Sequence, residues 1–327
     1  MNDYALLDLS KLLPDALQLT YSRTNQLSPG FLHRRKIVHE DLSKGSERFP
    51  VRVVNDVDAA KTADFIYTTR ILDRNGVLAA RQNTLVTFCC CNGVCSTGCE
   101  CTSGIYDEYG FAHESSLEWP FMECSAVCTC SLRCGNRVAQ KGATYAIEVF
   151  RTCDGRGWAV RALRDIRRGA FIGEYTGELL SDTEMARSER VDTYFFETRV
   201  GKSLYTVDAR LYGNFTRFIN HSCRPNAAVA MVIWEAQLEK LNHICIFATE
   251  NISKGDEITI SYGESWWKAK LPQFSCKCGH DNCEFTEERR KAELHRLAVE
   301  ESVNTHTRAV STASTSSSYD SDEKCSV

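Results

Sequence analysis

Short runs of β-branched and aromatic residues recur between residues 145 and 262, and turn residues separate them. One run extends from Phe171 to Tyr175 and another from His243 to Phe247. Turn signals such as Arg168-Gly169 and Lys254-Gly255 lie between the runs. Short apolar runs bounded by turn residues are typical of β-strands. The pattern therefore predicts a mostly β domain with short helices in this part of the chain.

Only one stretch of this region, Ser181 to Arg190, has clear helical character. Ser181 or Asp182 is a suitable N-cap, and Glu184 follows closely, as in a capping box. Upstream, the runs Val51–Val54 and Phe65–Tyr67 predict short strands between polar turns.

The two ends of the chain differ from this body. A short amphipathic helix near the start is predicted by leucines at helical spacing, namely Leu6, Leu9, Leu12, Leu13 and Leu17. From Val303 onward Ser and Thr dominate, which predicts disorder. The start lacks the features of a signal peptide, and no apolar run reaches the ~18 residues of a membrane helix. We therefore expect an intracellular protein.

Cysteine is the unusual component of an otherwise globular composition, with 43% hydrophobic and 25% charged residues. The chain has 17 cysteines, which crowd between Cys89 and Cys134 and again between Cys276 and Cys283. Disulfides are rare in reducing compartments, and short clustered spacings are typical of metal sites. The two clusters therefore predict bound metal.

The first cluster fits a zinc cluster in which some thiolates bridge two ions. Zinc takes four tetrahedral ligands, so three ions need twelve ligand positions. Six terminal and three bridging thiolates supply these, which matches the nine cysteines Cys89, Cys91, Cys95, Cys99, Cys101, Cys124, Cys128, Cys130 and Cys134. Cys90 could replace Cys89. Two ordinary four-cysteine sites with loose thiols remain the alternative.

These nine cysteines resemble the pre-SET module of SET-domain histone-lysine methyltransferases, in which such a three-zinc cluster is found. The approach from Asp41 to Pro50, followed by Val54 to Asp58, resembles the euchromatic branch that methylates lysine 9 of histone H3. The resemblance extends from about Ile37 to Glu287 and implies several small curved sheets with a C-terminal pseudoknot. It divides the chain into an N-terminal helical or wrapping segment (1–36), the pre-SET zinc module with its lead-in (37–144), the SET domain (145–265), a post-SET zinc segment (266–288) and a C-terminal extension (289–327).

Four stretches of the SET region resemble the family's functional motifs: residues 155–158, 193–196, 217–226 and 255–263. From the residues alone, the first reads as a turn, the second as a buried strand, and His221 as a structural histidine. The resemblance implies binding of S-adenosylmethionine by Arg156, Gly157, Trp158, Tyr194, Arg217, Asn220, His221 and Trp266.

The same resemblance makes Tyr262 the catalytic residue, with help from Tyr194. The cofactor already carries an activated methyl group. The enzyme must deliver a neutral lysine amine, although the pKa of free lysine is about 10.4. Desolvation beside a cationic sulfur favours the neutral amine, and alignment of the reacting atoms supplies much of the rate. The substrate channel is implied to include Phe196, Ile260, Trp267 and Asp192.

Two residues depart from the family pattern. Ile260 stands where an aromatic residue is usual, and because it has no hydroxyl we expect a roomier pocket and di- or trimethylation. Ser261 stands where Asp is usual. A catalytically weak module that binds histone tails is therefore the alternative function. The acids Asp182, Glu184 and Asp192 would suit a basic tail or form a solvated face.

The second cluster supplies only three cysteines, Cys276, Cys278 and Cys283. His280 could complete the site locally, whereas the resemblance brings Cys223 as the fourth ligand. A fourth zinc ion bound there would tie the C-terminal segment over the active site, so that metal loss would affect activity as well as stability.

The charge of the chain suits a basic partner. The formal net charge is −4, and with thirteen thiolates and four zinc ions it would become about −9. This balance argues against nonspecific duplex DNA binding, and no Lys/Arg-rich helix flanks the clusters. We expect the histone H3 tail and chromatin-associated proteins as partners, in the nucleus on chromatin, with neither membrane nor sequence-specific nucleic-acid binding.

Overall fold

The computed structural model describes residues 36–78, 89–95, 99, 101, 104–186, 192–235 and 240–314. Residues Ile37–Val327 belong to one compact unit. The predicted N-terminal helix lies outside the described residues. Strands predominate within these ranges, as predicted. Among the described helices, none combines the length and apolar character needed to cross a membrane.

A four-stranded sheet joins the lead-in of the cysteine-rich region to the β-rich body. Its order is β1 (Ile37–His39), β2 (Arg52–Val54), β5 (Ile147–Arg151) and β6 (Trp158–Ala162). β2 and β5 are parallel, whereas β1 pairs antiparallel with β2 and β6 antiparallel with β5. The strand predicted at residues 51–54 is confirmed. β6 starts at the Gly155–Trp158 turn and thus leads away from the predicted cofactor motif.

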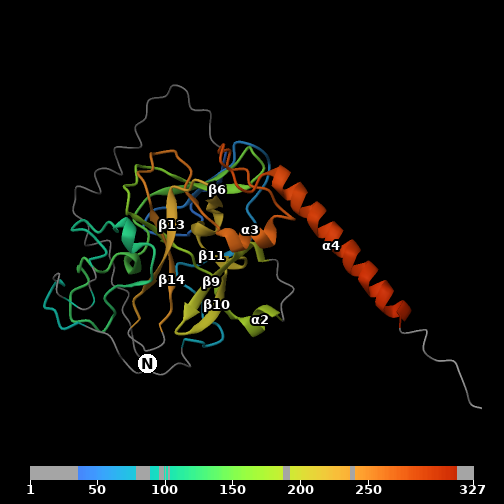
Figure 1. Cartoon of the computed structure of the whole chain (residues 1–327). Helices are drawn as coiled ribbons and strands as arrows, with labels where there is room; N and C mark the ends of the chain where they lie inside the picture. The colour runs from blue at the N-terminus through green and yellow to red at the C-terminus, as the bar shows by residue number, and fades with distance from the viewer. Residues whose placement is uncertain are drawn as a thin grey trace, which may run out of the picture. The chain divides into compact units, whose positions relative to one another are not determined.

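The second four-stranded sheet has the order β4 (Phe121–Met122), β13 (Ala227–Ile233), β14 (His243–Ala248) and β7 (Phe171–Glu174). All six residues of β14 are buried, because strands flank it on both sides and apolar side chains cover its two faces. Figure 1 shows β13 and β14 side by side, in their antiparallel pairing. β4 lies within the cysteine-rich region, so this sheet connects that region to the body.

A three-stranded sheet carries the predicted helix. Its order is β8 (Glu178–Ser181), β10 (Ser203–Asp208) and β9 (Phe195–Val200), and α2 (Asp182–Ala186) follows β8 directly. The Ser181 backbone N–H and hydroxyl both donate to Glu184 Oε2, at 2.8 Å each. This is the reciprocal half of a capping box, so the predicted cap is confirmed.

Two parallel pairs connect segments that are far apart in the chain. β3 (Ile66–Tyr67) pairs with β11 (Tyr212–Gly213), and β12 (Asn220–His221) pairs with β15 (Thr259–Ile260). The second pair brings two of the predicted functional stretches together, and that contact is one which the predicted pseudoknot requires. Single-turn 3₁₀ segments are η2 (Glu114–Ser116), η3 (Ala139–Lys141), η4 (Asp192–Tyr194) and η5 (Phe215–Phe218).

Two helices follow β15. α3 (Glu264–Lys270) covers the Tyr262 region, and α4 (Glu287–Ser314) runs into the tail. The prediction of disorder from Val303 onward is therefore wrong for residues 303–314, while 315–327 lie outside the described residues. Ion pairs three or four residues apart, such as Arg296 with Glu293 and Glu300, support helix propagation into this Ser/Thr-rich stretch.

Candidate functional site

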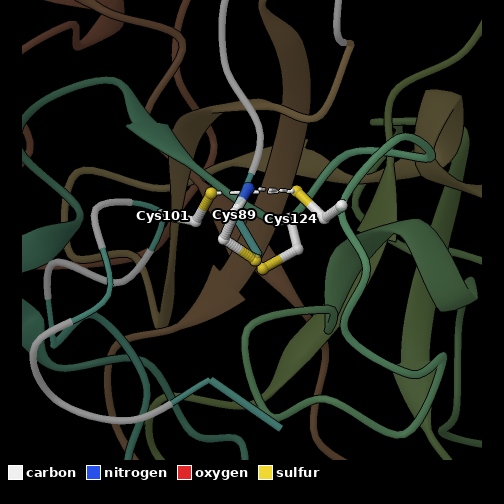
Figure 2. A group of neighbouring side chains, drawn as sticks. Cys89, Cys101 and Cys124 are labelled. Carbon is white, nitrogen blue, oxygen red and sulfur yellow. Dashed lines mark hydrogen bonds between the residues drawn. The ribbon is translucent and has the colours of Figure 1, made fainter. Parts of the chain in front are cut away.

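The nine cysteines of the first cluster, called here the nine-cysteine cluster, converge in space. The Sγ atoms of eight of them form overlapping groups of four in which all sulfurs lie within 4.8 Å of one another, and the ninth, Cys134, contacts Cys95 and Cys130. One group contains Cys89, Cys101, Cys124 and Cys128, and another contains Cys89, Cys91, Cys95 and Cys99. Figure 2 shows Cys89, Cys101 and Cys124, whose side chains converge from separate segments.

Three of these cysteines lie where bridging ligands are needed. Cys89 and Cys95 have Sγ atoms 3.4 Å apart, Cys95 and Cys124 have theirs 3.5 Å apart, and all three share a group with Cys130. The other six cysteines then form three pairs that could each complete one ion: Cys101 with Cys128, Cys91 with Cys99, and Cys130 with Cys134. The Sγ atom of Cys134 contacts both Cys130 and Cys95. Three bridging and six terminal cysteines would give each of three zinc ions four sulfurs.

The distances suit zinc. Two sulfurs each ~2.3 Å from a tetrahedral ion lie roughly 3.8 Å apart, and the Sγ atoms of Cys101 and Cys128 are 3.8 Å apart. Cys89 is buried and belongs to the groups, whereas Cys90 is exposed and belongs to none of them. The geometry thus favours Cys89 over Cys90 as the ligand.

Donor groups surround the nine-cysteine cluster. Asn136 Nδ2 donates to Cys101 O at 2.6 Å and to Cys124 Sγ at 3.4 Å. Arg137 donates to Cys124 O at 2.9 Å and to Cys130 Sγ at 3.5 Å. Positive charge and N–H donors directed at sulfur stabilise thiolates, the form that binds metal.

The second group, called here the four-cysteine site, consists of Cys223, Cys276, Cys278 and Cys283. Cys223 Sγ lies 3.9 Å from Cys276 Sγ and 3.8 Å from Cys283 Sγ, again the spacing of a tetrahedral zinc site. His280 is exposed and is not part of the group. The structure therefore places Cys223, from the segment after β12, where the local alternative would place His280.

The Gly155–Trp158 turn is held by a carboxylate that the sequence analysis did not single out. Gly157 has a φ of +97°, a conformation that favours glycine. Arg156 forms a bidentate pair with Glu257, both contacts at 2.8 Å. Asn220 Nδ2 donates to the same carboxylate at 3.2 Å and to Trp158 O at 3.1 Å. Glu257 thus joins two predicted cofactor residues, Arg156 and Asn220, and Asn220 in turn binds the third, Trp158.

Tyr262 lies at the centre of the site. Its hydroxyl donates to Ile219 O at 2.9 Å, and its backbone N–H donates to His221 Nδ1 at 3.1 Å. Burial raises the pKa of Tyr262 above its usual value of 10, so the hydroxyl stays protonated at neutral pH. The Trp266 ring packs edge-on, with 4.8 Å between centroids.

His221 is a neutral, orienting group in this arrangement. Burial lowers the pKa of His221 to about 4, so the ring is uncharged at neutral pH. Because Nδ1 accepts from Tyr262, the proton of the neutral ring belongs on Nε2, which lies 3.4 Å from Cys223 Sγ. The histidine therefore links the tyrosine to the four-cysteine site.

An aromatic wall completes this side. Trp267 stacks on Phe285 with 4.6 Å between centroids and 8° between planes, and it packs edge-on against His221 at 5.0 Å. Trp267 Nε1 is buried with no hydrogen-bond partner among the described residues. Phe285 follows closely after Cys283 in the sequence, so the four-cysteine site holds one face of the wall.

A second aromatic group surrounds Tyr194. The Tyr175 hydroxyl donates to Tyr194 O at 2.8 Å, and the Phe196 ring lies 5.4 Å from that of Tyr175. The Arg217 guanidinium lies 4.1 Å from the Tyr194 ring centroid, and its Nε donates to Ala209 O at 2.8 Å. Arg217 Nη1 is buried without a partner in the described chain. Arg217 thus contacts the Tyr194 ring instead of the Arg156 network.

The remaining residues named from the sequence differ in their exposure to solvent. Ile260 is 3% exposed and packs in the main core beside Tyr262. Ser261 is exposed, and its Oγ accepts from the Gly263 N–H. Asp192 begins η4, but its side chain lies outside the described residues. The structure therefore brings together all the predicted stretches, with Glu257 as an addition.

Comparison with known proteins agrees with this arrangement. The SET domain model matches residues 157–263, and the Pre-SET motif model matches residues 43–137. The chain is 34% identical to mouse histone-lysine N-methyltransferase EHMT1 over 84% of its own length, and 33% identical to Xenopus laevis SUV39H1 over 71%. It spans 22% of the EHMT1 relative and 62% of the SUV39H1 relative.

Solved structures give the same result. The structure of Arabidopsis thaliana SUVH6 in complex with SAM matches with a TM-score of 0.68 and 28% identity, covering 81% of this chain and 58% of that one. The Neurospora histone lysine methyltransferase DIM-5 matches with a TM-score of 0.58 and 28% identity, covering 66% of this chain and 96% of that one. The chain therefore contains a pre-SET motif and a SET domain and is homologous to the EHMT1 and SUV39H histone-lysine methyltransferases.

Proposed function

We propose that this protein transfers methyl groups from S-adenosylmethionine to a lysine side chain, lysine 9 of histone H3. The observation that carries the proposal is Tyr262, whose buried hydroxyl is fixed by Ile219 O and whose backbone is fixed by His221. Relatives support the substrate class: SUVH6 of Arabidopsis is named H3 lysine-9 specific, and a KRYPTONITE structure contains an H3(1–15) peptide.

The residues present fit such a cofactor. The rings of Tyr194, Tyr262 and Trp266 offer the π faces that attract a cation such as a sulfonium. At the neighbouring turn Arg156, held by Glu257, keeps further N–H donors, and Asn220 offers its Oδ1 as an acceptor. When bound, S-adenosylmethionine supplies an activated methyl group, so no strong base is demanded of the protein. We assign cofactor binding to the eight residues predicted for it, with Arg217 acting through Tyr194.

The protein's own contribution is to present a neutral amine in the correct position. An ammonium group that enters a desolvated aromatic channel loses hydration, which favours release of its proton to water. The Tyr262 hydroxyl donates its hydrogen bond to Ile219 O, so the lone pairs of its oxygen are free to accept an N–H from the amine. That contact fixes the direction of the nitrogen lone pair, and such positioning supplies much of the rate.

Metal is part of the proposal. The nine-cysteine cluster suits three zinc ions and the four-cysteine site suits one, because their sulfur spacings match tetrahedral coordination. In this assignment Cys89, Cys95 and Cys124 would each bind two ions, and the other ten cysteines of the predicted set would each bind one. The first three ions would be structural, whereas the fourth would hold the wall beside Tyr262.

The product is proposed to be di- or trimethyl-lysine. Ile260 presents an aliphatic side chain, without a hydroxyl, at the position next but one to Tyr262. We place this activity in the nucleus on chromatin, because the substrate is a histone. Asp192 and Phe196 are proposed to line the substrate side of the channel.

The test is a methyl-transfer assay with the zinc-loaded full chain, S-adenosylmethionine and an H3 peptide, read by mass spectrometry for site and methyl count. Tyr262→Phe removes the hydroxyl and should lower the rate by 10²-fold or more, roughly the size of losing one catalytic donor. Tyr109→Phe, at a tyrosine that is 72% exposed, is the matched control and should leave the rate unchanged. An H3 peptide in which arginine replaces the lysine at position 9 should accept no methyl group.

The alternative, a module that binds histone tails without methylating them, makes a different prediction for the same assay. Peptide binding with no transfer across several pH and salt conditions would sink the enzyme proposal. Ser261 is exposed and makes only a local turn contact, so its departure from the family pattern does not disturb the Tyr262 contacts.

A further inference from the structure

Three exposed arginines gather at one edge of the β1-β2-β5-β6 sheet. Arg48 precedes β2, Tyr145 precedes β5, and Arg164 and Arg167 follow β6. β2 and β5 run parallel and β6 runs antiparallel to them, so the starts of the first two and the end of the third lie at the same edge. The topology therefore places these arginines together, although they are up to 119 residues apart in the chain.

The arginines are held by aromatic rings. Arg164 lies over the rings of Tyr145 and Phe49, at 4.8 and 5.7 Å from the centroids, and Arg48 lies over Phe49 at 5.9 Å. Arg167 lies over Phe111 at 4.5 Å. A guanidinium stacked on a ring keeps its N–H edge directed outward and loses less freedom when it binds a planar anion.

Carboxylates do not neutralise this group. In the described part of the chain, Arg48, Arg164 and Arg167 form no ion pair, whereas Arg151, Arg156, Arg161 and Arg168 each have an acidic partner. The nearby acids keep their charge but are directed to other donors. Asp165 accepts the Lys254 N–H, Glu47 accepts the Tyr67 hydroxyl, and Glu114 pairs with Arg168.

We propose that this basic edge, defined as Arg48, Arg164 and Arg167 with the rings of Phe49, Phe111 and Tyr145, binds the phosphate backbone of duplex DNA without reading its sequence. The net charge of −4 argues against general attraction to DNA, but a local array of guanidiniums acts within a Debye length of ~8 Å. The net charge of the whole chain therefore does not reveal the locally positive charge of this edge.

The chemistry favours phosphate over an acidic protein surface. Protein docking sites have an apolar centre, whereas DNA interfaces are polar and strongly positive. At this edge the rings are half-buried beneath the guanidiniums, so the exposed surface consists largely of N–H donors, of which one on Arg164 is donated to Thr144 O at 3.2 Å. Arginine forks match phosphate oxygens in bidentate geometry.

The basic edge lies close enough to the cofactor turn for bound DNA to present a substrate for the proposed methyl transfer. This one step rests on the proposed function. β6 runs from Trp158, at the cofactor turn, to Ala162, at the basic edge. Five strand residues span roughly 16 Å. DNA held at this edge lies within about 2 nm of the cofactor turn, so a histone tail that leaves a nucleosome beside its DNA can reach Tyr262.

The binding itself is tested directly. Fluorescence anisotropy with two unrelated labelled 20-base-pair duplexes, over 50–200 mM salt, should give equal affinities that fall with salt. The triple variant R48A/R164A/R167A should weaken binding about 10-fold or more at 50 mM salt and lower the salt slope by roughly 2 to 3. The charge-preserving variant R48K/R164K/R167K should restore most of the salt slope.

The matched control removes three exposed lysines from elsewhere, Lys61, Lys202 and Lys291, by alanine substitution. An equal loss of affinity in this control, or no duplex binding by the parent chain at 50 mM salt, would overturn the proposal. Competition by polyglutamate as strong as by DNA would also overturn it, in favour of an acidic protein partner. Thermal unfolding of each variant verifies that the fold is intact.

Activity separates this proposal from the proposed function. The arginine-to-alanine triple variant should methylate free H3 peptide at the parent rate and nucleosomes at least several-fold more slowly. If no variant methylates the peptide, the proposed function fails while the anisotropy result still decides DNA binding. Equal slowing on peptide and nucleosome would overturn the role of the basic edge in substrate docking.

Discussion

The two cysteine groups of this protein contain the same ligand type but are built in opposite ways. The nine-cysteine cluster draws all its ligands from one stretch, residues 89–134, and six of its nine side chains are buried. The four-cysteine site joins Cys223 to residues 276–283, and all its side chains are half-exposed. The first is closed within one module, and the second joins distant parts of the chain.

The difference teaches what each group can control. The nine-cysteine cluster takes the place of a hydrophobic core in a region with few apolar residues of its own, because its buried cysteines pack together and bound metal would hold them there. The four-cysteine site closes a long loop and positions Phe285 against Trp267, and Trp267 against His221. We therefore expect loss of the first to affect folding and loss of the second to affect chemistry.

The largest expected effect is that of Cys124→Ser. Cys124 is fully buried and belongs to two of the groups of four, where it would bridge two ions, so its loss should dismantle the whole cluster. Structural zinc contributes about 10–16 kcal/mol, which equals or exceeds the ~5–15 kcal/mol by which domains are stable. The variant should therefore fail to fold, as measured by zinc content and circular dichroism.

A matched control is Cys245→Ala, at an equally buried cysteine in β14 that belongs to neither group. It loses packing alone and should cost roughly 1–2 kcal/mol while retaining four zinc ions. A folded Cys124→Ser protein with three ions in the cluster would contradict the bridging assignment.

Cys283→Ser should have the next largest effect and should separate activity from folding. Its zinc content should fall by one ion, and methyl transfer should fall about 10²-fold, because a wall displaced by 1 Å costs roughly that much in rate. The main unfolding transition should change by no more than about 1–2 kcal/mol. Asn282→Ser, at the exposed neighbouring residue, is the control and should leave both readouts unchanged.

A third prediction concerns the sheet that connects the nine-cysteine region to the body. His243, in β14, contacts Glu174 of β7 and Glu235 after β13, and the Trp234 ring stacks on it at 3.4 Å. Burial alone would lower the pKa of His243, but its hydrogen bonds to Glu174 and Glu235 raise it to about 9. The imidazolium has two N–H donors, one for each carboxylate, whereas the neutral ring has one.

The sign follows from the raised pKa. Protonated His243 contributes its full stability below the unfolded pKa of about 6.5 and loses it as pH rises through about 9. A shift of this size corresponds to roughly 3 kcal/mol. Urea unfolding at pH 6.5 and 9.5 measures the loss, and His243→Arg, which keeps its charge, should remove this part of the pH dependence. Cys245 interacts electrostatically with Glu174, Glu235 and Glu123, and these four residues are the same in His243→Arg and in the parent protein.

How far the sequence predicts these features depends on distance along the chain. Nine cysteines at short spacings predict a three-zinc cluster by ligand counting, but counting cannot say which three bridge. That choice of Cys89, Cys95 and Cys124 depends on how the segments cross in space. The fourth ligand of the second site, Cys223, came from the family resemblance, because local spacing alone left His280 open.

Charged residues inside apolar runs were the features that the sequence could not assign. Glu257 lies in a strand-like stretch, and nothing in the sequence singled it out, yet it binds Arg156 and Asn220. His243 and Glu174 lie in two predicted strands, and only the pairing of β14 with β7 brings them together. Long-range pairing is not visible in local periodicity, and the α4 helix beyond Val303 shows that composition can mislead as well.

The smallest expected effects are those of substituting two residues that neighbour the predicted ligands in the sequence but are not part of either cysteine group. Cys90 neighbours Cys89 but is exposed, and His280 lies between Cys278 and Cys283 but is also exposed. Cys90→Ser and His280→Ala should each leave four zinc ions bound and change stability by no more than ~0.5 kcal/mol. Loss of one ion in His280→Ala would make the second group a local finger and remove its link to Tyr262. Loss of ions in Cys90→Ser would make Cys90 a ligand of the nine-cysteine cluster, but all ligands of that cluster would still come from residues 89–134. Only the His280→Ala result can therefore contradict the contrast between the nine-cysteine cluster and the four-cysteine site.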